Sequence, residues 1–256
     1  MKPLHGLHVV VTRPEAQAGR FCELLEQAGA IAHRYPVMAI KAAHLAPANL
    51  QRLHQTAYYQ WAIFISANAV EHGLALLGNT AAFSHTRIGA IGKQTAATLQ
   101  SHGLKADLVP KAGFTSEDFL ALPAMQALAG QRILIVRGGD GREVLADTLR
   151  QRGANVDYAD VYWRICPPNP PQRLKQLHDS GQLDIISLTS SESLRNLLGL
   201  LHPSDWVKAI PLLVGSGRIA ADATQAGFTN TIIVAPNPAD DSMLTALREW
   251  RQDKET

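Results

Sequence analysis

The stretch TRPEAQAGRFCELLEQAGAI at residues 12–31 has a counterpart in VRGGDGREVLADTLRQRGAN at residues 136–155. Both stretches follow a short β-branched run, carry an arginine at its end, and continue into a helix that closes on Gly-Ala. This order of features is typical of a buried strand that leads into a helix with one apolar face. In the first stretch the apolar face is formed by Phe21, Leu24, Leu25 and Ala28.

The two stretches belong to a longer internal repeat with a shift of 124 positions. Over 25 aligned positions from Arg13 onwards, six residues are identical, against roughly one or two expected by chance. The repeat also aligns Ser66 with Ser190 and Gly92 with Gly215. Each copy alternates short apolar strands with amphipathic helices, which predicts an α/β protein with two parallel-sheet lobes of roughly 120 residues each. The strands expected in the first copy are Val9–Val11, Ala62–Ile65, Arg87–Ile91 and Leu108–Val109.

The composition is that of an ordinary globular protein. The chain has 256 residues, of which 46% are hydrophobic and 18% charged, and this balance excludes disorder. Its net charge of +2 is too small for a nucleic-acid surface, and no apolar run approaches the ~20 residues of a membrane span. The N-terminus lacks the apolar core and cleavage site of a signal peptide. Since Cys22 and Cys166 form no metal or redox spacing, we expect free thiols in a reducing cytoplasm, with neither nucleic acid nor membrane as partner.

Small polar residues occupy six junctions between strands and helices. Ligands of open parallel sheets bind at such junctions, beyond the carboxyl ends of the strands, where glycine admits close backbone contact and helix N-termini attract anions. The same residue types are ordinary helix N-caps, so one junction alone is ambiguous. Six such junctions, all at the carboxyl ends of their strands, favour a ligand with several carboxylates or phosphates. The candidate binding residues are Thr12, Arg13, Ser66, Ala67, Asn68, Gly92, Lys93, Thr95, Arg137, Gly138, Ser190, Ser191, Gly215, Ser216, Gly217 and Arg218.

Motifs for other chemistries are absent from the sequence. Neither GAIG at 89–92 nor VGSG at 214–217 is a dinucleotide fingerprint, and no phosphate-loop Gly-Lys-Ser/Thr occurs. The histidines form no metal-binding pattern, and there is no nucleophile elbow. We therefore expect no metal and no cofactor.

Tyr162 lies in the Pro-containing extended stretch at 161–172, which matches a similar stretch at 35–47 in the other copy. Both stretches are candidate linkers. A tyrosine at such a place either packs as a hinge residue or presents its phenol to the ligand as a hydrogen-bond donor or weak general acid. The residues alone leave both interpretations open.

Five segments, in their order and spacing, resemble the uroporphyrinogen-III synthase family over nearly the whole chain. They are VTRPEAQAGRFCELLEQAGA, FISANAVEHGL, IGAIGKQTAATLQSHGLKADLVPKAGFTSEDFLAL, ILIVRGGDGREVLADTLRQRGANVDYADVYWR, and PLLVGSGRIAADATQAGF followed by VAPNPADDSMLTAL. The resemblance implies two flavodoxin-like lobes, with parallel sheets flanked by helices, joined by a two-stranded linker. One lobe would then comprise 1–36 and 168–256 and the other 40–164, with linkers at about 36–40 and 162–168.

The resemblance also implies a reaction. Such synthases are cyclising hydro-lyases of haem and sirohaem biosynthesis that convert linear hydroxymethylbilane to uroporphyrinogen III, with loss of water and inversion of ring D. They use no metal or cofactor, and the reaction passes through an azafulvene and a spiro intermediate. The protein then mainly folds the substrate and places ring D. A cytoplasmic monomer is expected, in transient contact with the preceding enzyme of the pathway.

The resemblance gives individual residues a role. Tyr162 matches the family's linker tyrosine, the candidate for assisting departure of the hydroxyl, and Thr95 matches a threonine in a G-x-x-T loop. The counterpart of Thr95 in the other lobe is Arg218, where the family commonly has Thr or Ser, and an arginine there is suited to pairing with a substrate carboxylate. Arg13 and Arg137 are expected to face each other across one cleft.

Two other functions use the same kind of fold. A non-enzymatic bilobal protein that binds a polyanionic small molecule would have similar loops and a hinge, but such proteins are usually exported and no export signal is present. A nucleotide- or flavin-using enzyme is opposed by the missing phosphate loops. The synthase is therefore the predicted function.

Overall fold

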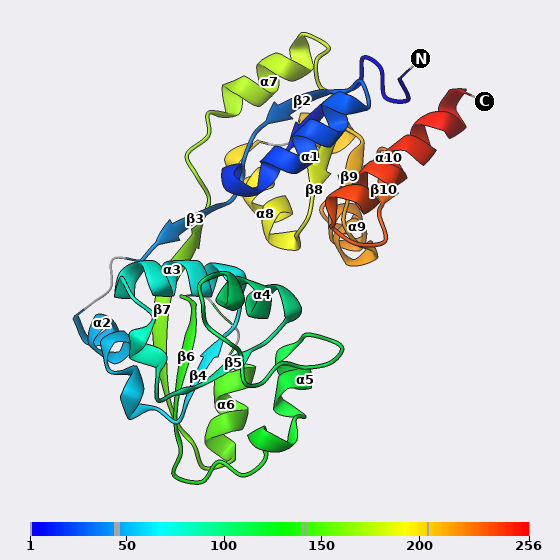
Figure 1. Ribbon diagram of the computed structural model, residues 1–256. Helices are drawn as coiled ribbons and strands as arrows, with labels where there is room; N and C mark the ends of the chain where they lie inside the picture. The colour runs from blue at the N-terminus through cyan, green and yellow to red at the C-terminus, as the bar shows by residue number, and fades with distance from the viewer. Residues whose placement is uncertain (1, 44–46, 140, 142, 204, 256) are drawn as a thin grey trace. The chain divides into compact units, whose positions relative to one another are not determined.

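The computed structural model describes residues 2–43, 47–139, 141, 143–203 and 205–255. The chain divides into two compact units, each with its own sheet (Figure 1). Unit 1 comprises Met1–Ala39 and Ile165–Thr256, and unit 2 comprises Ile40–Arg164. Unit 2 is thus one continuous segment that lies between the two parts of unit 1 along the sequence.

Unit 1 contains a five-stranded parallel sheet in the order β10-β9-β8-β1-β2. Counted from the N-terminus of this unit the order is 2-1-3-4-5, as in flavodoxin-like folds. Helices α1 and α10 cover the apolar core on one face, and α7, α8 and α9 cover the core on the other. The strands are β1 (His8–Val11), β2 (Ile31–Arg34), β8 (Ile185–Leu188), β9 (Leu212–Val214) and β10 (Ile232–Val234). The helices are α1 (Glu15–Gln27), α7 (Pro171–Asp179), α8 (Ser191–Leu200), η4 (Asp205–Ala209), α9 (Gly217–Gln225) and α10 (Asp240–Glu255).

Unit 2 contains a second five-stranded sheet in the order β3-β7-β6-β4-β5, in which β7, β6, β4 and β5 pair in parallel. Helices α2, α3 and α4 cover one face, and α5 and α6 cover the other. The strands are β3 (Ala39–Ala42), β4 (Trp61–Phe64), β5 (Arg87–Ala90), β6 (Arg132–Gly138) and β7 (Asn155–Ile165). The helices are α2 (Pro47–His54), η1 (Thr56–Tyr58), α3 (Ala67–Leu77), η2 (Ala81–Phe83), α4 (Lys93–Ser101), α5 (Ser116–Leu120), η3 (Pro123–Met125) and α6 (Val144–Gln151).

The internal repeat is visible in the two sheets. It carries β1 onto β6, β2 onto β7, β4 onto β8 and β5 onto β9. Written in matching order, the sheets read β2-β1-β8-β9-β10 and β7-β6-β4-β5, and a parallel bridge from Gly89 of β5 to Leu108 stands at the place of β10. The two units therefore have the same arrangement of strands in space, although the chain visits those strands in a different order. The predicted α/β fold of two parallel-dominated sheets flanked by helices is confirmed.

The strand expected at Leu108–Val109 is reduced in the structure to the single bridge of Leu108. The N–H of Ile88 on the neighbouring strand donates to the carboxylate of Asp107 at 2.7 Å instead of to a strand carbonyl. Pro110 then lacks the N–H that a longer ladder requires. The Asp107 carboxylate, which takes the Ile88 N–H, and Pro110, which has no N–H, together keep this strand short.

The linker expected at 162–168 begins later than predicted, because β7 continues as a strand to Ile165. Tyr162 pairs with Gly138 of β6, and on the other side the Ala43 N–H donates to the Val161 carbonyl at 3.0 Å. Strands β3 and β7 are hydrogen-bonded neighbours, so the two segments that connect the units run side by side. Tyr162 thus belongs to a strand that has hydrogen-bonded neighbours on both sides.

Candidate functional site

Within each unit, the polar junctions predicted from the sequence lie at the carboxyl ends of neighbouring strands. They contain Thr12, Ser190 and Gly215 in unit 1, and Ser66, Gly92 and Gly138 in unit 2. The chain connects strands toward one edge of the sheet on one side of the β1–β8 pair and toward the other edge on the other side. The same reversal occurs between β4 and β6 in unit 2. Such a switch point is where open α/β sheets bind ligands. The fold therefore brings the candidate residues together in two sets, one at an edge of each sheet.

The helices that begin at these junctions differ in how their first N–H groups are satisfied. Ser66 caps α3 and Ser190 caps α8, each accepting the N–H three residues further on, at 3.1 Å and 3.0 Å. The cap residues of α4 and α9 are Gly92 and Ser216, and neither makes a side-chain cap hydrogen bond. The starts of α4 and α9 therefore lack a side-chain cap, and anion binding by their N–H groups stays a prediction.

Thr12 and Arg13 are tied into unit 1. Thr12 is fully buried, and its hydroxyl donates to the Ser187 carbonyl at 2.6 Å. The Arg13 guanidinium forms an ion pair with Asp240 and donates to the Pro238 carbonyl at 2.8 Å. These contacts hold the β1 junction to β8 and to the start of α10. Substrate binding by either side chain stays a prediction.

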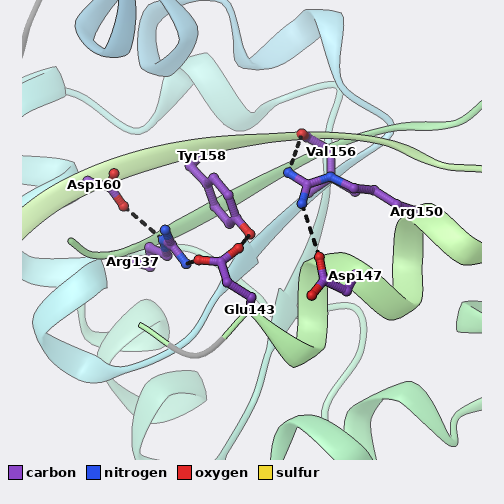
Figure 2. A network of polar contacts seen from close by, with 7 residues as sticks. All are labelled: Arg137, Glu143, Asp147, Arg150, Val156, Tyr158 and Asp160. Carbon is purple, nitrogen blue, oxygen red and sulfur yellow. Dashed lines mark hydrogen bonds and ion pairs between the residues drawn. The ribbon is translucent and has the colours of Figure 1, made fainter. Parts of the chain in front are cut away.

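Arg137 is the centre of a polar network in unit 2 (Figure 2). Its Nε donates to Asp160 and its Nη1 to Glu143, both at 2.8 Å, and its Cζ lies 3.6 Å from the centroid of the Tyr158 ring. Burial opposes the charge, but the hydrogen bonds to Glu143 and Asp160 outweigh it and raise the pKa of Arg137. The hydrogen bond from Tyr158, followed by that from Arg137, lowers the pKa of Glu143. Arg137 is thus a charged, buried group with hydrogen bonds at Nε and Nη1, and the expected cleft that it would share with Arg13 stays a prediction.

The remaining loop residues keep more of their polar groups accessible. Ala67 and Asn68 open α3 and are half-buried, whereas Gly217 at the start of α9 is exposed. Arg218, the residue that departs from the family pattern, donates to the Ser191 hydroxyl at 3.1 Å and so links α9 to α8. Its exposed guanidinium lies beside the uncapped start of α9, a placement that suits an anionic group.

The start of α4 carries an aromatic neighbour that the sequence patterns missed. Lys93 is exposed, and its Nζ lies 5.0 Å from the centroid of the Phe114 ring. Phe114 has a φ of 59°, which is rare for a bulky residue. Thr95 is buried in the first turn of α4. The contact of Lys93 with Phe114 joins residues 21 positions apart, so no local sequence pattern identifies Phe114.

Tyr162 is buried in unit 2 with its hydroxyl directed to α3. The residue is 1% exposed, its hydroxyl lies 3.2 Å from Ser66 Oγ, and its ring centroid lies 5.7 Å from that of His72. A Cβ on Gly138 would come within 2.6 Å of the ring, so glycine is needed there. A hollow of about 20 Å³ beside the ring has room for about one water molecule. The hollow is lined by Ile65, Gly138, Gly139, Gly141, Tyr162 and Arg164.

Sequence reasoning also missed the acidic partners of the two arginines. Asp240 is 227 positions from Arg13, and Asp160 is 23 positions from Arg137. Asp160 faces Arg137 only because of the pairing of β6 with β7. Strand register, and not spacing, is the signal that would have found it.

Two flavodoxin-like units, each with small polar residues at the carboxyl ends of a parallel-dominated sheet, define a class of two-domain α/β proteins. Within that class, the chain belongs to the uroporphyrinogen-III synthase family. A sequence profile of the family described as "Uroporphyrinogen-III synthase HemD" matches residues 19–245. The resemblance seen in the sequence is thereby confirmed.

Individual relatives and solved structures agree with this assignment. The uroporphyrinogen-III synthases of Salmonella typhimurium (strain LT2) and Escherichia coli (strain K12) are 30% and 29% identical over 248 residues, covering 94% of this chain and 100% of theirs. A crystal structure of a mutant uroporphyrinogen III synthase from the extremely thermophilic bacterium Thermus thermophilus gives a TM-score of 0.66 at 19% identity, covering 97% of this chain and 100% of that one. Uroporphyrinogen-III synthetase from Helicobacter pylori 26695 gives 0.60 at 17% identity, covering 95% and 99%. At these identities the structural likeness establishes the fold.

Membrane spans and metal clusters are both missing from the part of the chain that the structure describes. None of its helices combines the length and the apolar character required to cross a membrane. No group of three or more His, Cys, Asp and Glu side chains among the described residues is placed to hold a metal ion.

Proposed function

We propose that this chain is a uroporphyrinogen-III synthase, an enzyme of tetrapyrrole biosynthesis that cyclises hydroxymethylbilane to uroporphyrinogen III with loss of water and inversion of ring D. Membership of the family over most of the chain is the observation that carries this proposal. The helix starts at the carboxyl ends of both sheets support it, because a substrate with many carboxylates needs many separate donors and not a strongly basic surface.

The binding groups fall into two kinds. The accessible donors are the N–H groups at the uncapped starts of α4 and α9, together with Asn68, Lys93, Arg218 and the hydroxyl of Ser216. Thr95, Ser66, Ser190 and Ser191 stand beside them in the first turns of their helices or at their caps. We assign Thr12, Arg13 and Arg137 to the support of these loops, since the Thr12 hydroxyl, both Nη groups of Arg13, and the Nε and Nη1 groups of Arg137 bond within their own units.

We assign Tyr162 the role of proton donor to the departing hydroxyl of the substrate. Its phenol would give a proton to the oxygen that leaves as water, while the pyrrole nitrogens of the substrate supply the electrons. Ser66, 3.2 Å away, can exchange a hydrogen bond with the phenol and so hold it in place. Most of the catalysis then comes from folding the substrate and excluding the spontaneous closure.

We further propose a cytoplasmic monomer that receives its substrate in a transient contact with the preceding enzyme of the pathway. The cysteines support a reducing compartment, since Cys22 and Cys166 are both free and Cys166 is exposed. An unstable linear substrate is the reason to expect direct transfer.

The function is tested by supplying hydroxymethylbilane to the purified chain, oxidising the products and separating the uroporphyrin isomers by chromatography. We expect the type III isomer to predominate, with type I in the blank without protein, because type I arises from spontaneous closure. A binding protein without catalytic activity would give only the type I isomer, and that result would contradict the proposal.

A further inference from the structure

Strand β7 contains an extra residue just before Tyr162. The pairing of β6 with β7 is regular from Arg132 opposite Asn155 to Arg137 opposite Asp160, and the next pair is Gly138 opposite Tyr162. Val161 therefore has no partner of its own in β6, which is the definition of a β-bulge. Bulges are uncommon between parallel strands and commonly redirect a side chain next to a functional site.

The bulge changes the face of the sheet to which Tyr162 points. Before it, Val156 and Tyr158 pack on the core beneath α6, whereas Ala159 and Val161 belong to the core beneath α3. Strict alternation along the strand would send Tyr162 to the α6 side. Instead, Tyr162 joins Val161 in the core beneath α3. Only there does its hydroxyl meet Ser66, the cap of α3.

An ion pair between a buried arginine and a half-buried aspartate lies one residue before the bulge, at the last regular pair of the two strands. Arg137 Nε donates to the Asp160 carboxylate at 2.8 Å, and the side chains are 8% and 23% exposed. Arg137 is itself fixed on two further sides by Glu143 and by the ring of Tyr158 (Figure 2). An ion pair at this position opposes a slip of register that would absorb the extra residue.

We propose that Arg137 and Asp160 are positioning residues, whose ion pair fixes the bulge at Val161 and so aims the Tyr162 hydroxyl at Ser66. This inference rests on the proposed role of Tyr162 for its catalytic consequence, although the geometry of the bulge stands without it. The competing interpretation is an ion pair that only stabilises unit 2.

A fluorine probe tests the positioning without relying on activity. The chain has five tyrosines, so protein grown with 3-fluorotyrosine should give five fluorine resonances, and the one missing in Tyr162→Phe belongs to Tyr162. The paired variant Arg137→Met with Asp160→Leu removes the ion pair without leaving a buried charge unpaired, which keeps the fold accessible. Asp160→Asn retains an oxygen that accepts from Arg137. Asp157→Asn is the matched control, since Asp157 lies on the same strand but contacts Tyr59 and Arg52.

We expect the Tyr162 resonance to shift or broaden in the paired variant and to stay near its wild-type position in Asp160→Asn and Asp157→Asn. An unchanged Tyr162 resonance in the folded paired variant would overturn the proposal. A shift of equal size in Asp157→Asn would overturn it as well, because any loss of a polar contact in β7 would then suffice.

Kinetics provide the second readout. We expect the paired variant to lower kcat about tenfold, and to change it by less than about twofold when Tyr162 is already phenylalanine. Losses that multiply in the combined variant would show that the ion pair acts on the fold and not through Tyr162. If Tyr162→Phe alone keeps full activity, the catalytic role of Tyr162 fails, and the fluorine resonance still decides the positioning.

Discussion

Replacing Tyr162 with phenylalanine is expected to lower kcat by about a hundredfold while the chain stays folded. The ring packs beside Gly138 and His72 in the core of unit 2, and phenylalanine keeps that packing. The lost hydroxyl is the one that lies 3.2 Å from Ser66, and Ser66 retains its cap bond to the Ala69 N–H. The loss is incomplete because orientation of the substrate continues without a proton donor.

The measurement is kcat for conversion of hydroxymethylbilane, with the isomer ratio recorded in the same reactions. Tyr59→Phe is the matched control, since Tyr59 is also buried and also loses one hydrogen bond, in its case to Asp157 at 3.0 Å. We expect little change of kcat in that control. Full activity of Tyr162→Phe would exclude the phenol as the proton donor.

Replacing Arg137 with alanine is expected to lower the free energy of unfolding by about 3–5 kcal/mol, because the change leaves the carboxylate of Asp160 without its buried partner. The Arg137 side chain is 8% exposed and that of Asp160 is 23% exposed, so water replaces the lost contacts poorly. The stacking of the guanidinium on Tyr158 is lost as well. The effect therefore exceeds that of removing a surface charge.

Urea unfolding at neutral pH measures this loss. Arg150→Ala is the control from the same network, since its side chain is 43% exposed and pairs with Asp147 at 3.4 Å. We expect the control to cost less than about 1 kcal/mol. Equal costs for the two substitutions would mean that Arg137 gains nothing from its burial, and a wild-type stability of Arg137→Ala with weakened substrate binding would return it to the set of ligand-binding residues.

Much of the fold could be predicted from the repeat. Because the repeat pairs His8–Val11 with Arg132 onwards and Trp61–Phe64 with Ile185–Leu188, it predicts which strands are equivalent, and the sheets have those strands in matching places. The repeat alone suggests a division at the middle of the chain. In the structure, the chain instead passes from unit 1 to unit 2 after Ala39 and returns to unit 1 after Arg164. A repeat records equivalent segments and does not specify which of them share a sheet, so the division came from the family resemblance.

The candidate site could be predicted only in part. Strand-to-helix junctions are visible in the pattern, and Ser66, Gly92, Ser190 and Ser216 all lie at helix caps. The orientation of Tyr162 depends on a bulge. One extra residue in a strand moves the following side chain to the other face of the sheet, and no sequence pattern indicates it here. The contacts of Arg137 are likewise hard to predict, because the register of β7 against β6 places Asp160 opposite it.

Amide hydrogen exchange in the presence and absence of uroporphyrinogen III tests most directly whether the loops at the carboxyl ends of the two sheets bind the tetrapyrrole. The site predicts slower exchange in the liganded protein at the starts of the helices that follow these strands, namely at 66–70, 92–96, 190–194 and 215–220. It predicts no change at the opposite, amino ends of the strands, at 59–60 and 182–184. Protection confined to those amino ends, or absent from the helix starts at saturating product, would contradict the proposed site.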